Sequence, residues 1–417
     1  MSSGTGPLRV ALLSYRGSPH SGGQGVYVRY LSRALRELGH EVTVFTGPPY
    51  PDVSDGVSLV EVPSLELYRP EDPFRRPRRD EFRDAIDVLE YATMCAAGFP
   101  EPLTFSLRAA RILKANAPRF DVVHDNQCLG YGLLDMKRAG LPVLATIHHP
   151  IPLDRKMEVA NAPSRSKRAS LKRWYAFTRM QGRVARRLPR IIAVSEHGRA
   201  DSIREFKVSP ERISVVHNGV DSALFRPLPD IPRRRGRIIT TASADVPLKG
   251  LSFLIEAVAK LNTEREVELV VIGKSRPEGA AQTAIDRFGL KDLVRFESSV
   301  EWLRLVELYA EAEVAVVPSL YEGFSLPAAE AMSCGVALVS TTGGALPEVA
   351  GRHGESALLV PPGDAEALAS AIRRLLDDRS LRERLGASGR ERVLKHFSWK
   401  HAASKTVDEY RRVIEGC

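Results

Sequence analysis

Two glutamates, Glu322 and Glu330, stand on either side of a turn that is suited to bind an anion. The turn, Gly323-Phe324-Ser325, leads into a short predicted helix from Leu326, and Pro327 is favoured in its first turn because proline needs no N–H partner there. Free backbone N–H groups and the positive end of the helix dipole would attract a phosphate. Carboxylates repel phosphate, so we expect both glutamates to accept hydrogen bonds from hydroxyl groups. An anion flanked by hydroxyls describes a nucleotide sugar. The alternative is a helix start with two solvated acids.

A glycine-rich turn containing Gly22 and Gly23 follows the predicted strand 8–13. Adjacent glycines let a ligand approach the backbone closely. The turn lacks the GxGxxG spacing and the acid of a dinucleotide site, which counts against a dehydrogenase. An ordinary tight turn is the alternative interpretation.

His148 and His149 follow the predicted strand 143–147. Side chains of adjacent residues on extended backbone point in opposite directions, so at most one of them faces a ligand. No HxxxH spacing or nearby cysteine supplies further metal ligands, and we expect no metal site. His148 is therefore either a structural histidine or a hydrogen-bonding group at a substrate.

Lys249 lies at the predicted start of a helix that runs from Leu251 to Leu261. The helix dipole disfavours a cation at that end. A phosphate in front of the lysine would explain its place, and a solvated surface lysine is the alternative.

The elements that position these residues form two successive sets of short apolar strands with helices between them. The predicted strands are 8–13, 42–45, 122–124, 143–147, 191–194 and 213–216 in the first set, and 238–240, 269–272, 294–296, 314–317, 337–339 and 358–360 in the second. This pattern is typical of parallel sheets that helices cover on both faces, where ligands bind outside the carboxyl ends of the strands. A stretch rich in proline and arginine, 226–237, is the predicted linker.

The composition agrees with two globular domains. A chain of 417 residues exceeds what one hydrophobic core usually supports. No apolar run approaches the length of a membrane span, and the first residues lack the regions of a signal peptide. Four scattered cysteines give no disulfide framework. These features predict a cytoplasmic protein.

The charge of the chain favours anionic partners. The formal net charge is +9 and the pI is about 9.4. Basic residues with aromatic neighbours gather in segments 74–79 and 155–190. Segments of this kind can bind anionic membranes. Such binding would make the protein peripheral on the inner face of the cell membrane. The alternative is that these residues form a solvated helical face. No nucleic acid is expected, because no RNA-binding signature with aromatics on strands is present.

Taken together, these segments resemble the family 4 retaining glycosyltransferases of the GT-B fold. The resemblance extends over nearly the whole chain and rests on an ordered set of motifs. They are Gly22-Gly23, Gly39-His40-Glu41-Val42, His148, Asn218-Gly219-Val220-Asp221, Lys249-Gly250, Tyr309-Ala310, Val317-Pro318-Ser319, the E-x7-E motif Glu322 to Glu330, Cys334-Gly335, Gly343-Gly344 with Glu348, 360–364 and Phe397-Ser398-Trp399.

The resemblance implies two doubly wound, Rossmann-like domains, 1–222 on the acceptor side and 223–395 on the nucleotide-sugar side, which face each other across a cleft. A helix in 396–417 would cross back onto the first domain.

The resemblance also implies roles for individual residues. Glu322 would bind the donor sugar and Glu330 the ribose, while Lys249 and the backbone of the loop from Gly323 to Leu326 would hold the diphosphate. Gly22 and Gly23 would let the first domain approach that diphosphate, and His148 would contact the sugar or the acceptor. Catalysis would involve His148, Lys249 and Glu322.

The chain departs from the family pattern just before Lys249. Family members carry Gly-Arg there, and the arginine helps to hold the diphosphate, whereas this chain has Ser243 and Ala244. Losing a charge-assisted donor weakens phosphate binding unless another arginine replaces it, and Arg276 is the candidate by position.

The expected reaction moves a sugar from a nucleoside diphosphate to an acceptor hydroxyl with retention, without a metal or another cofactor. A lipid or lipid-linked acceptor would agree with the basic segments. The alternatives are a sugar-nucleotide epimerase of similar fold and a catalytically impaired protein that only binds sugar nucleotides.

Overall fold

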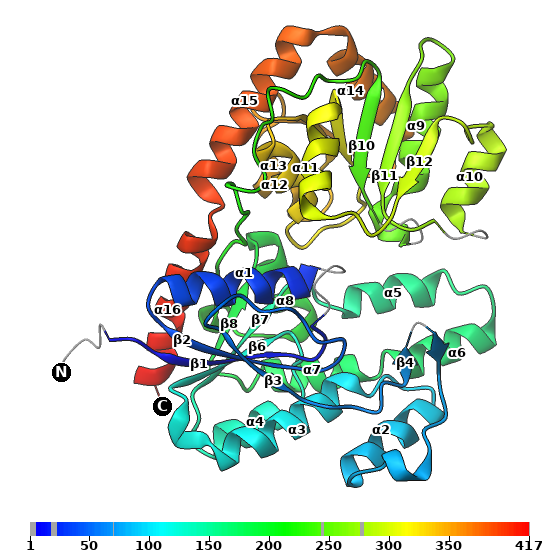
Figure 1. The fold of residues 1–417 in the computed structure, drawn as a ribbon. Coiled ribbons are helices and arrows are strands. Elements are labelled where there is room, and N and C mark those ends of the chain that lie inside the picture. Colours follow the sequence, from blue (N-terminus) through cyan, green and yellow to red (C-terminus); the bar gives the residue numbers. More distant parts are fainter. Residues whose placement is uncertain (1–5, 18–22, 70, 243–245, 276–278, 417) are drawn as a thin grey trace. The chain divides into compact units, whose positions relative to one another are not determined.

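The computed structural model describes residues 6–17, 23–69, 71–242, 246–275 and 279–416. The chain divides into two compact units (Figure 1). Unit 1 comprises residues 1–216 and 400–417, and unit 2 comprises His217–Trp399. The first division therefore falls at 216/217 instead of the predicted 222/223, and the second at 399/400 instead of 395/396.

Unit 1 is built on a parallel seven-stranded sheet in the order β3-β2-β1-β6-β7-β8-β9. Its strands are β1 (Arg9–Ser14), β2 (Glu41–Thr46), β3 (Ser58–Glu61), β6 (Val122–Asn126), β7 (Val143–Ile147), β8 (Arg190–Ala193) and β9 (Ile213–Val215), and a separate antiparallel pair consists of β4 (Tyr68–Arg69) and β5 (Asp72–Pro73). Its helices are α1 (Gly23–Glu37), α2 (Ala85–Cys95), α3 (Glu101–Ala115), α4 (Gly132–Arg138), α5 (Pro152–Ala160), α6 (Arg165–Trp174), α7 (Phe177–Ala185), α8 (Glu196–Phe206) and nearly all of α16 (Trp399–Glu415).

Unit 2 is built on a parallel six-stranded sheet in the order β12-β11-β10-β13-β14-β15. Its strands are β10 (Arg237–Thr241), β11 (Glu268–Ile272), β12 (Val294–Glu297), β13 (Val314–Val317), β14 (Ala337–Thr341) and β15 (Leu358–Val360). Its helices are α9 (Leu251–Asn262), α10 (Ala280–Phe288), α11 (Trp302–Glu311), α12 (Leu326–Ser333), α13 (Leu346–Ala350), α14 (Ala365–Asp377) and α15 (Arg379–His396). Short 3-10 helices lie at Arg79–Glu81, Ala117–Arg119, Pro210–Arg212 and Pro247–Lys249.

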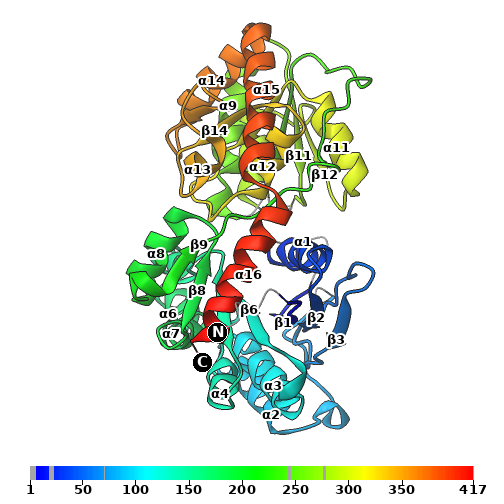
Figure 2. The ribbon, with the colours of Figure 1, turned by 90° about the vertical axis from the view of Figure 1, so that its left-hand side faces the viewer.

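Successive side chains of a strand point to opposite faces of its sheet, and helices pack on both faces of each sheet. In unit 1, Ala11 and Leu13 of β1 pack with α3, α4 and α7 in one core cluster. The opposite face carries polar contacts to helices: Tyr27 of α1 hydrogen-bonds Thr146 of β7, and Tyr410 of α16 hydrogen-bonds His124 of β6. Figure 2 shows α16 lying along unit 1 beside β6 and β8. In unit 2, α9, α14 and residues of α10 and α15 cover one face of the sheet. The predicted class, two Rossmann-like domains with parallel sheets, is confirmed.

The stretch predicted as a linker, 226–237, belongs to unit 2. The guanidinium of Arg233 donates to the carbonyl of Gly335 at 3.0 Å, and Arg237 is buried within β10, where it forms ion pairs with Glu268 and Glu311. These contacts fix the stretch on unit 2.

No helix in the described ranges is long and apolar enough to cross a membrane.

Candidate active site

The strand order of unit 2 reverses between β10 and β13. A lysine and a glutamate that the sequence predicts for the donor site follow these two strands. Lys249 lies in the loop after β10, and Glu322 lies in the loop after β13. Chains leaving neighbouring strands at a reversal of the strand order diverge to opposite faces of the sheet, which leaves a crevice where ligands of such folds bind. The two residues predicted for the donor site therefore meet at this switch point.

The sequence predicts Lys249 at the start of α9. In the structure, Lys249 instead ends the short 3-10 helix Pro247–Lys249, which precedes α9. Gly250 separates the two helices with a positive φ of 64°, and an added Cβ there would lie 2.0 Å from the carbonyl oxygen of Pro318. The backbone N–H of Leu320 also donates to the carbonyl of Leu248 at 2.7 Å. The Lys249 loop is thus seated directly on the segment that follows β13.

The Lys249 ammonium donates to both carboxylate oxygens of Glu322, at 2.8 and 3.0 Å. The Ser319 hydroxyl donates to the same carboxylate at 2.7 Å. Glu322 is buried, whereas the Lys249 side chain is about a third exposed. The pair therefore keeps a cation at the switch point and orients a carboxylate that still has lone pairs for a ligand hydroxyl.

Glu330 lies on α12 and is buried. Burial raises the pKa of its carboxyl group to about 7. This carboxyl group has no hydrogen-bond partner among the residues that the structure describes. It is therefore free to accept hydrogen bonds from ligand hydroxyls, and such bonds would favour its ionised form.

The loop before α12 carries backbone donors. Ser325 caps the helix from the left-handed region, with φ at 84°, and its hydroxyl accepts from the N–H of Ala328 at 3.4 Å. Pro327 lies in the first helical turn, as predicted. Within the described part of the chain, the N–H groups of Phe324, Ser325 and Leu326 have no acceptor, so they are available to an anion. Gly323, the first residue of the predicted anion loop, precedes them.

Two further loops hold this anion loop in place. The N–H of Ala345 donates to the carbonyl of Glu322 at 2.9 Å, and a Cβ at Gly344 would lie 2.3 Å from that oxygen. On the other side, the Phe324 ring lies 6.2 Å from the His217 ring and 5.5 Å from the Phe397 ring, measured between centroids. His217, which precedes the motif 218–221, and the motifs at 343–344 and 397–399 therefore support the anion loop.

His148 belongs to unit 1 and follows β7. Its Nε2 lies 2.6 Å from the Oδ1 of Asn126, and its ring meets the edge of the Tyr27 ring at 4.6 Å between centroids. His149 pairs instead with Asp154 at 2.9 Å. The two histidines thus have different partners, and the prediction that at most one of them faces a ligand stays a prediction. The strand order of unit 1 also reverses next to β6, between β1 and β6.

Several predicted positions lie outside the described residues. These are Gly22, the departure at Ser243 and Ala244, and the candidate replacement Arg276. Gly23 is described and begins α1.

Sequence reasoning missed the partners that orient the predicted residues. Ser319 entered only as part of a motif, and Asn126, Gln127 and Tyr27 were not singled out. A polar run, Asp125-Asn126-Gln127, at the end of an apolar strand was the available signal for two of them.

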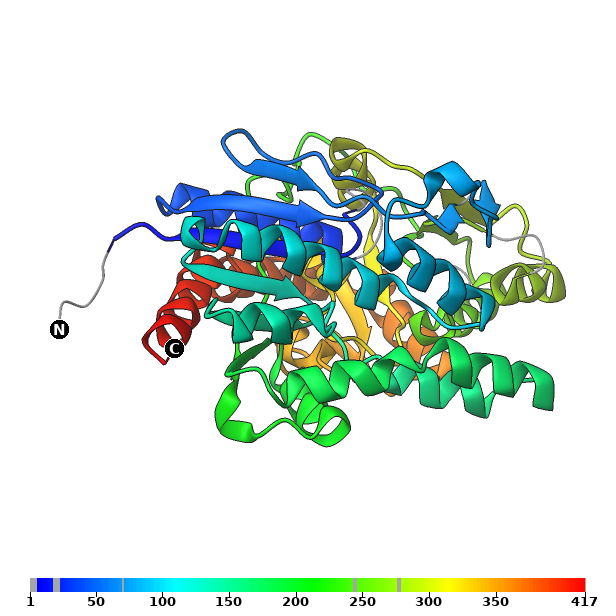
Figure 3. The ribbon, with the colours of Figure 1, turned by 90° about the horizontal axis from the view of Figure 1, so that it is seen from below.

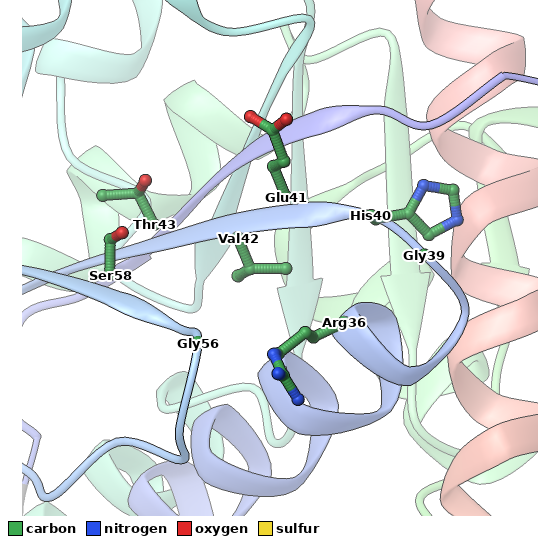
Figure 4. A pocket seen from close by; sticks show the side chains of 8 residues that line it. All are labelled: Arg36, Gly39, His40, Glu41, Val42, Thr43, Gly56 and Ser58. Carbon is green, nitrogen blue, oxygen red and sulfur yellow. The ribbon is translucent and has the colours of Figure 1, made fainter.

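A polar pocket in unit 1 lies away from these residues. It is lined by Arg36, Gly39, His40, Glu41, Val42, Thr43, Gly56 and Ser58 (Figure 4). These residues surround the starts of β2 and β3, whereas His148 and Asn126 lie at the carboxyl ends of their strands. Its geometry gives it no part in the site described above.

No group of three or more His, Cys, Asp or Glu side chains in the described ranges is arranged to hold a metal ion.

Comparisons with known proteins identify the family. Residues 21–224 match the family described as Glycosyltransferase Family 4, and residues 231–392 match Glycosyl transferases group 1. An MMP alpha-(1->4)-mannosyltransferase from Mycolicibacterium hassiacum is 52% identical over 98% of this chain and 98% of that protein. The chain is a family 4 glycosyltransferase.

Weaker relatives and solved structures agree. A D-inositol 3-phosphate glycosyltransferase 2 of Catenulispora acidiphila is 28% identical over 98% of this chain and 96% of that protein. The sucrose-phosphate synthase of Thermosynechococcus elongatus matches with a TM-score of 0.73 at 24% identity, covering 98% of this chain and 100% of that one. Anabaena HepE, solved with UDP and glucose, matches with a TM-score of 0.71 at 17% identity over 96% and 99%. These structures show the GT-B fold.

This glycosyltransferase is accordingly a hexosyltransferase. The recognition of the family, the fold class and the enzyme class predicted from the sequence are confirmed. The two alternatives, an epimerase and an impaired sugar-nucleotide-binding protein, are not favoured by these relatives.

Gly250→Ala tests whether the position of Lys249 controls transfer. The new Cβ would collide with the Pro318 carbonyl and must displace the Lys249 loop. A misplacement of about 1 Å at a reacting group costs on the order of 100-fold in rate, so we expect a loss of that size in the initial rate of sugar transfer, compared at equal amounts of folded protein.

Gly289→Ala is the matched control. Gly289 has nearly the same φ, 68°, but nothing lies within 4 Å of its added Cβ. Both variants carry a backbone strain of about 1–2 kcal/mol, and only Gly250→Ala carries the collision. Equal activity in the two variants would show that the seating of the Lys249 loop does not matter.

Proposed function

We propose that the protein transfers mannose from a nucleoside-diphosphate mannose to a sugar 4-hydroxyl, with retention of the α configuration. The relative that is 52% identical over nearly its whole length bears the name of an α-(1→4)-mannosyltransferase, which supports the sugar and the linkage. HepE, a structural neighbour, was solved with UDP and glucose, which supports a nucleoside diphosphate as the carrier.

The observation that carries the donor assignment is the cluster at the switch point of unit 2. Lys249 and the N–H groups of Phe324, Ser325 and Leu326 provide positive charge and donors for a diphosphate. Glu322 and Glu330 provide acceptors for hydroxyls on either side of it. This combination suits a nucleotide sugar, which has both a diphosphate and hydroxyl groups. A simple anion such as phosphate would leave the two carboxylates without a partner.

The same residues account for the chemical step. The bond between the anomeric carbon and the diphosphate oxygen breaks while the acceptor oxygen bonds to that carbon on the same face, and the departing diphosphate oxygen takes the acceptor proton. Negative charge grows on the diphosphate, and Lys249 with the loop N–H groups stabilises it. We propose that these groups suffice without a metal ion.

Donor binding must compete with the internal ion pair. In the structure the Lys249 ammonium is held by Glu322. A diphosphate carries more charge than one carboxylate, so it would draw the ammonium away and leave the Glu322 carboxylate to the sugar hydroxyls. Lys249 and Glu322 would therefore contribute to donor binding as a unit.

The donor assignment is tested by thermal denaturation with nucleoside diphosphates and their mannose conjugates. A ligand at 100 times its dissociation constant stabilises the folded state by about 2.7 kcal/mol, so one nucleotide should raise the melting temperature clearly. Lys249→Ala and Glu322→Ala should lose most of this shift, and Lys260→Ala, at a partly exposed lysine on α9, should keep it. The proposal fails if no nucleotide stabilises the wild-type protein, or if all three variants respond as the wild type does.

The buried acid predicts a pH-dependent donor affinity. The pKa of Glu330 lies at about 7 in the free protein, and ribose hydroxyls would bind its ionised form. The ionised fraction grows about tenfold between pH 6 and pH 8, so donor affinity should rise by about that factor as pH rises.

Calorimetry at three pH values measures this effect. An intact nucleotide sugar is the proper ligand, because its phosphates do not titrate in this range. Glu330→Gln should bind with an affinity that varies little with pH, and a wild-type affinity that stays constant would remove Glu330 from the ribose site.

We also propose that helix α6 binds an anionic membrane surface. It forms an antiparallel pair with α5 at the edge of unit 1 (Figure 3), and its residues are largely exposed. Five cations of α6 form no ion pair with any residue described: Arg165, Lys167, Arg168, Lys172 and Arg173. Some other cations of the predicted basic segments are already engaged, as Arg75 is with Glu81 and Lys156 with Glu205. An exposed aromatic, Phe74, lies against Trp174 at the end of α6.

Flotation with anionic liposomes tests this surface. Each cation near such a membrane contributes about 1 kcal/mol, so changing Lys167, Arg168, Lys172 and Arg173 to Gln should abolish binding at low salt. The same change at the exposed residues Arg374, Lys395, Lys400 and Lys405 lowers the net charge equally and should leave binding intact. Equal binding by both variants, or no binding by the wild type, would contradict the proposal.

A further inference from the structure

The loop that follows β6 has an unusual backbone. Gln127 and Leu129 both adopt positive φ values, 57° and 50°, although neither is a glycine. Such conformations are strained and persist only where surrounding contacts hold them, often at functional sites. Asn126 at the end of β6 and Gln127 in this loop both direct their side chains onto one short segment, His148 and His149.

Gln127 fixes the backbone of that segment. Its Oε1 accepts from the N–H of His148 at 2.5 Å and from the N–H of His149 at 3.2 Å, while its Nε2 donates to the carbonyl of His149. Gln181 in turn donates to the carbonyls of Gln127 and Cys128, each at 3.3 Å. The loop and the histidine segment therefore form one hydrogen-bonded unit.

Asn126 fixes the tautomer of the His148 ring. Its Nδ2 lies 3.3 Å from the backbone carbonyl of Gln24, which can only accept, so the amide nitrogen must point there and donate. The amide oxygen then faces Nε2 of His148 at 2.6 Å, and because this oxygen can only accept, Nε2 must carry the proton. In the neutral ring Nδ1 then holds a lone pair, and no described residue donates to it.

The surroundings keep the ring neutral. Burial lowers the pKa of His148 to about 3. Among the described residues, the titratable groups on the neighbouring elements are Tyr27 of α1, Asp125 and His124 of β6, Tyr410 of α16 and His149 with its partner Asp154.

None of these groups places a carboxylate on His148. Asp154 binds His149, and Asp125 accepts from the N–H of Leu129 at 2.9 Å, while burial raises its pKa to about 7. His124 is bound by Thr146 and Tyr410, each at 2.7 Å, and burial lowers its pKa to about 3.

We propose that Asn126 is a positioning residue: it fixes His148, which the family resemblance places at the sugar or the acceptor, in the Nε2–H form, so that Nδ1 can only accept a hydrogen bond from a substrate hydroxyl. The identity of the hydroxyl as one on a transferred or accepting sugar rests on the proposed function. The assignment has a consequence for specificity: a deoxy sugar that lacks this one hydroxyl would leave Nδ1 without a donor and would react more slowly.

The tautomer can be read without any substrate. In protein labelled with ¹⁵N-histidine, the two ring nitrogens of His148 should show the neutral Nε2–H form from pH 5 to pH 8, with the signal assigned by its absence from His148→Gln. A neutral Nδ1–H form, or an imidazolium at pH 6, overturns the proposal. This measurement stands even if no mannose transfer is found, in which case only the proposed function fails.

Asn126→Asp tests the positioning role. Aspartate keeps the acceptor for Nε2–H but adds a negative charge, which raises a neighbouring histidine pKa by about 1–3 units. The His148 signal should therefore titrate at least one pH unit higher than in the wild type. The ratio of kcat/KM between variant and wild type should fall as pH decreases from 8 to 5, by about tenfold where the pKa rises by the full three units, because the imidazolium cannot accept a hydrogen bond.

Asn161→Asp is the matched control, since it makes the same chemical change at an exposed position of unit 1. Its activity ratio to the wild type should stay constant over the same pH range. Asn126→Ala, which keeps no acceptor, should lower kcat/KM at every pH without an acidic limb. A constant ratio for Asn126→Asp across the range, in protein with the melting temperature of the wild type, would reduce Asn126 to a structural residue.

Discussion

The reversal of strand order in a parallel sheet is the constraint on which this molecule depends. All strands of a parallel sheet end at one edge, and only at the reversal do adjacent chains leave in opposite directions. In unit 2 this brings the loop after β10 next to the loop after β13, although Lys249 and Glu322 are far apart in sequence. In unit 1 the reversal lies between β1 and β6, and Asn126 ends β6 there. Both sets of candidate residues therefore follow from topology before any side chain is considered.

Close backbone contact converts this topology into fixed positions. Gly250 touches the Pro318 carbonyl and Gly344 touches the Glu322 carbonyl, and in both cases a side chain would occupy the space of the neighbouring backbone. Glycine costs conformational entropy wherever it is ordered, so such positions need a compensating gain. Here the gain is a cation and a carboxylate held at hydrogen-bonding distance on two separate loops.

The sequence was sufficient for the strands but not for the groups that orient the site. Strands 143–147, 314–317 and 358–360 have the predicted bounds because apolar residues on both faces mark a buried parallel strand. β3 was missed, since Ser58–Glu61 is short and only half-buried at the sheet edge. Asn126 was missed because its role depends on register: it pairs with Thr146, which places His148 within its reach. Neither the register nor the positive φ of Gln127 can be read from residue types.

The anion loop of unit 2 and the histidine segment of unit 1 differ in the charge of the groups that they present. Unit 2 presents an ammonium and free N–H groups, which suit a diphosphate whose charge increases as the sugar departs. Unit 1 buries His124 and His148 as neutral rings and raises the pKa of Asp125 toward neutrality, so the polar groups behind its candidate site act through hydrogen bonds rather than through charge. A neutral imidazole nitrogen accepts a hydrogen bond from a hydroxyl group and does not attract phosphate or other ions from solution. The candidate groups of the two units therefore differ in character, since unit 2 offers charge at its switch point and unit 1 offers a hydrogen bond of fixed direction.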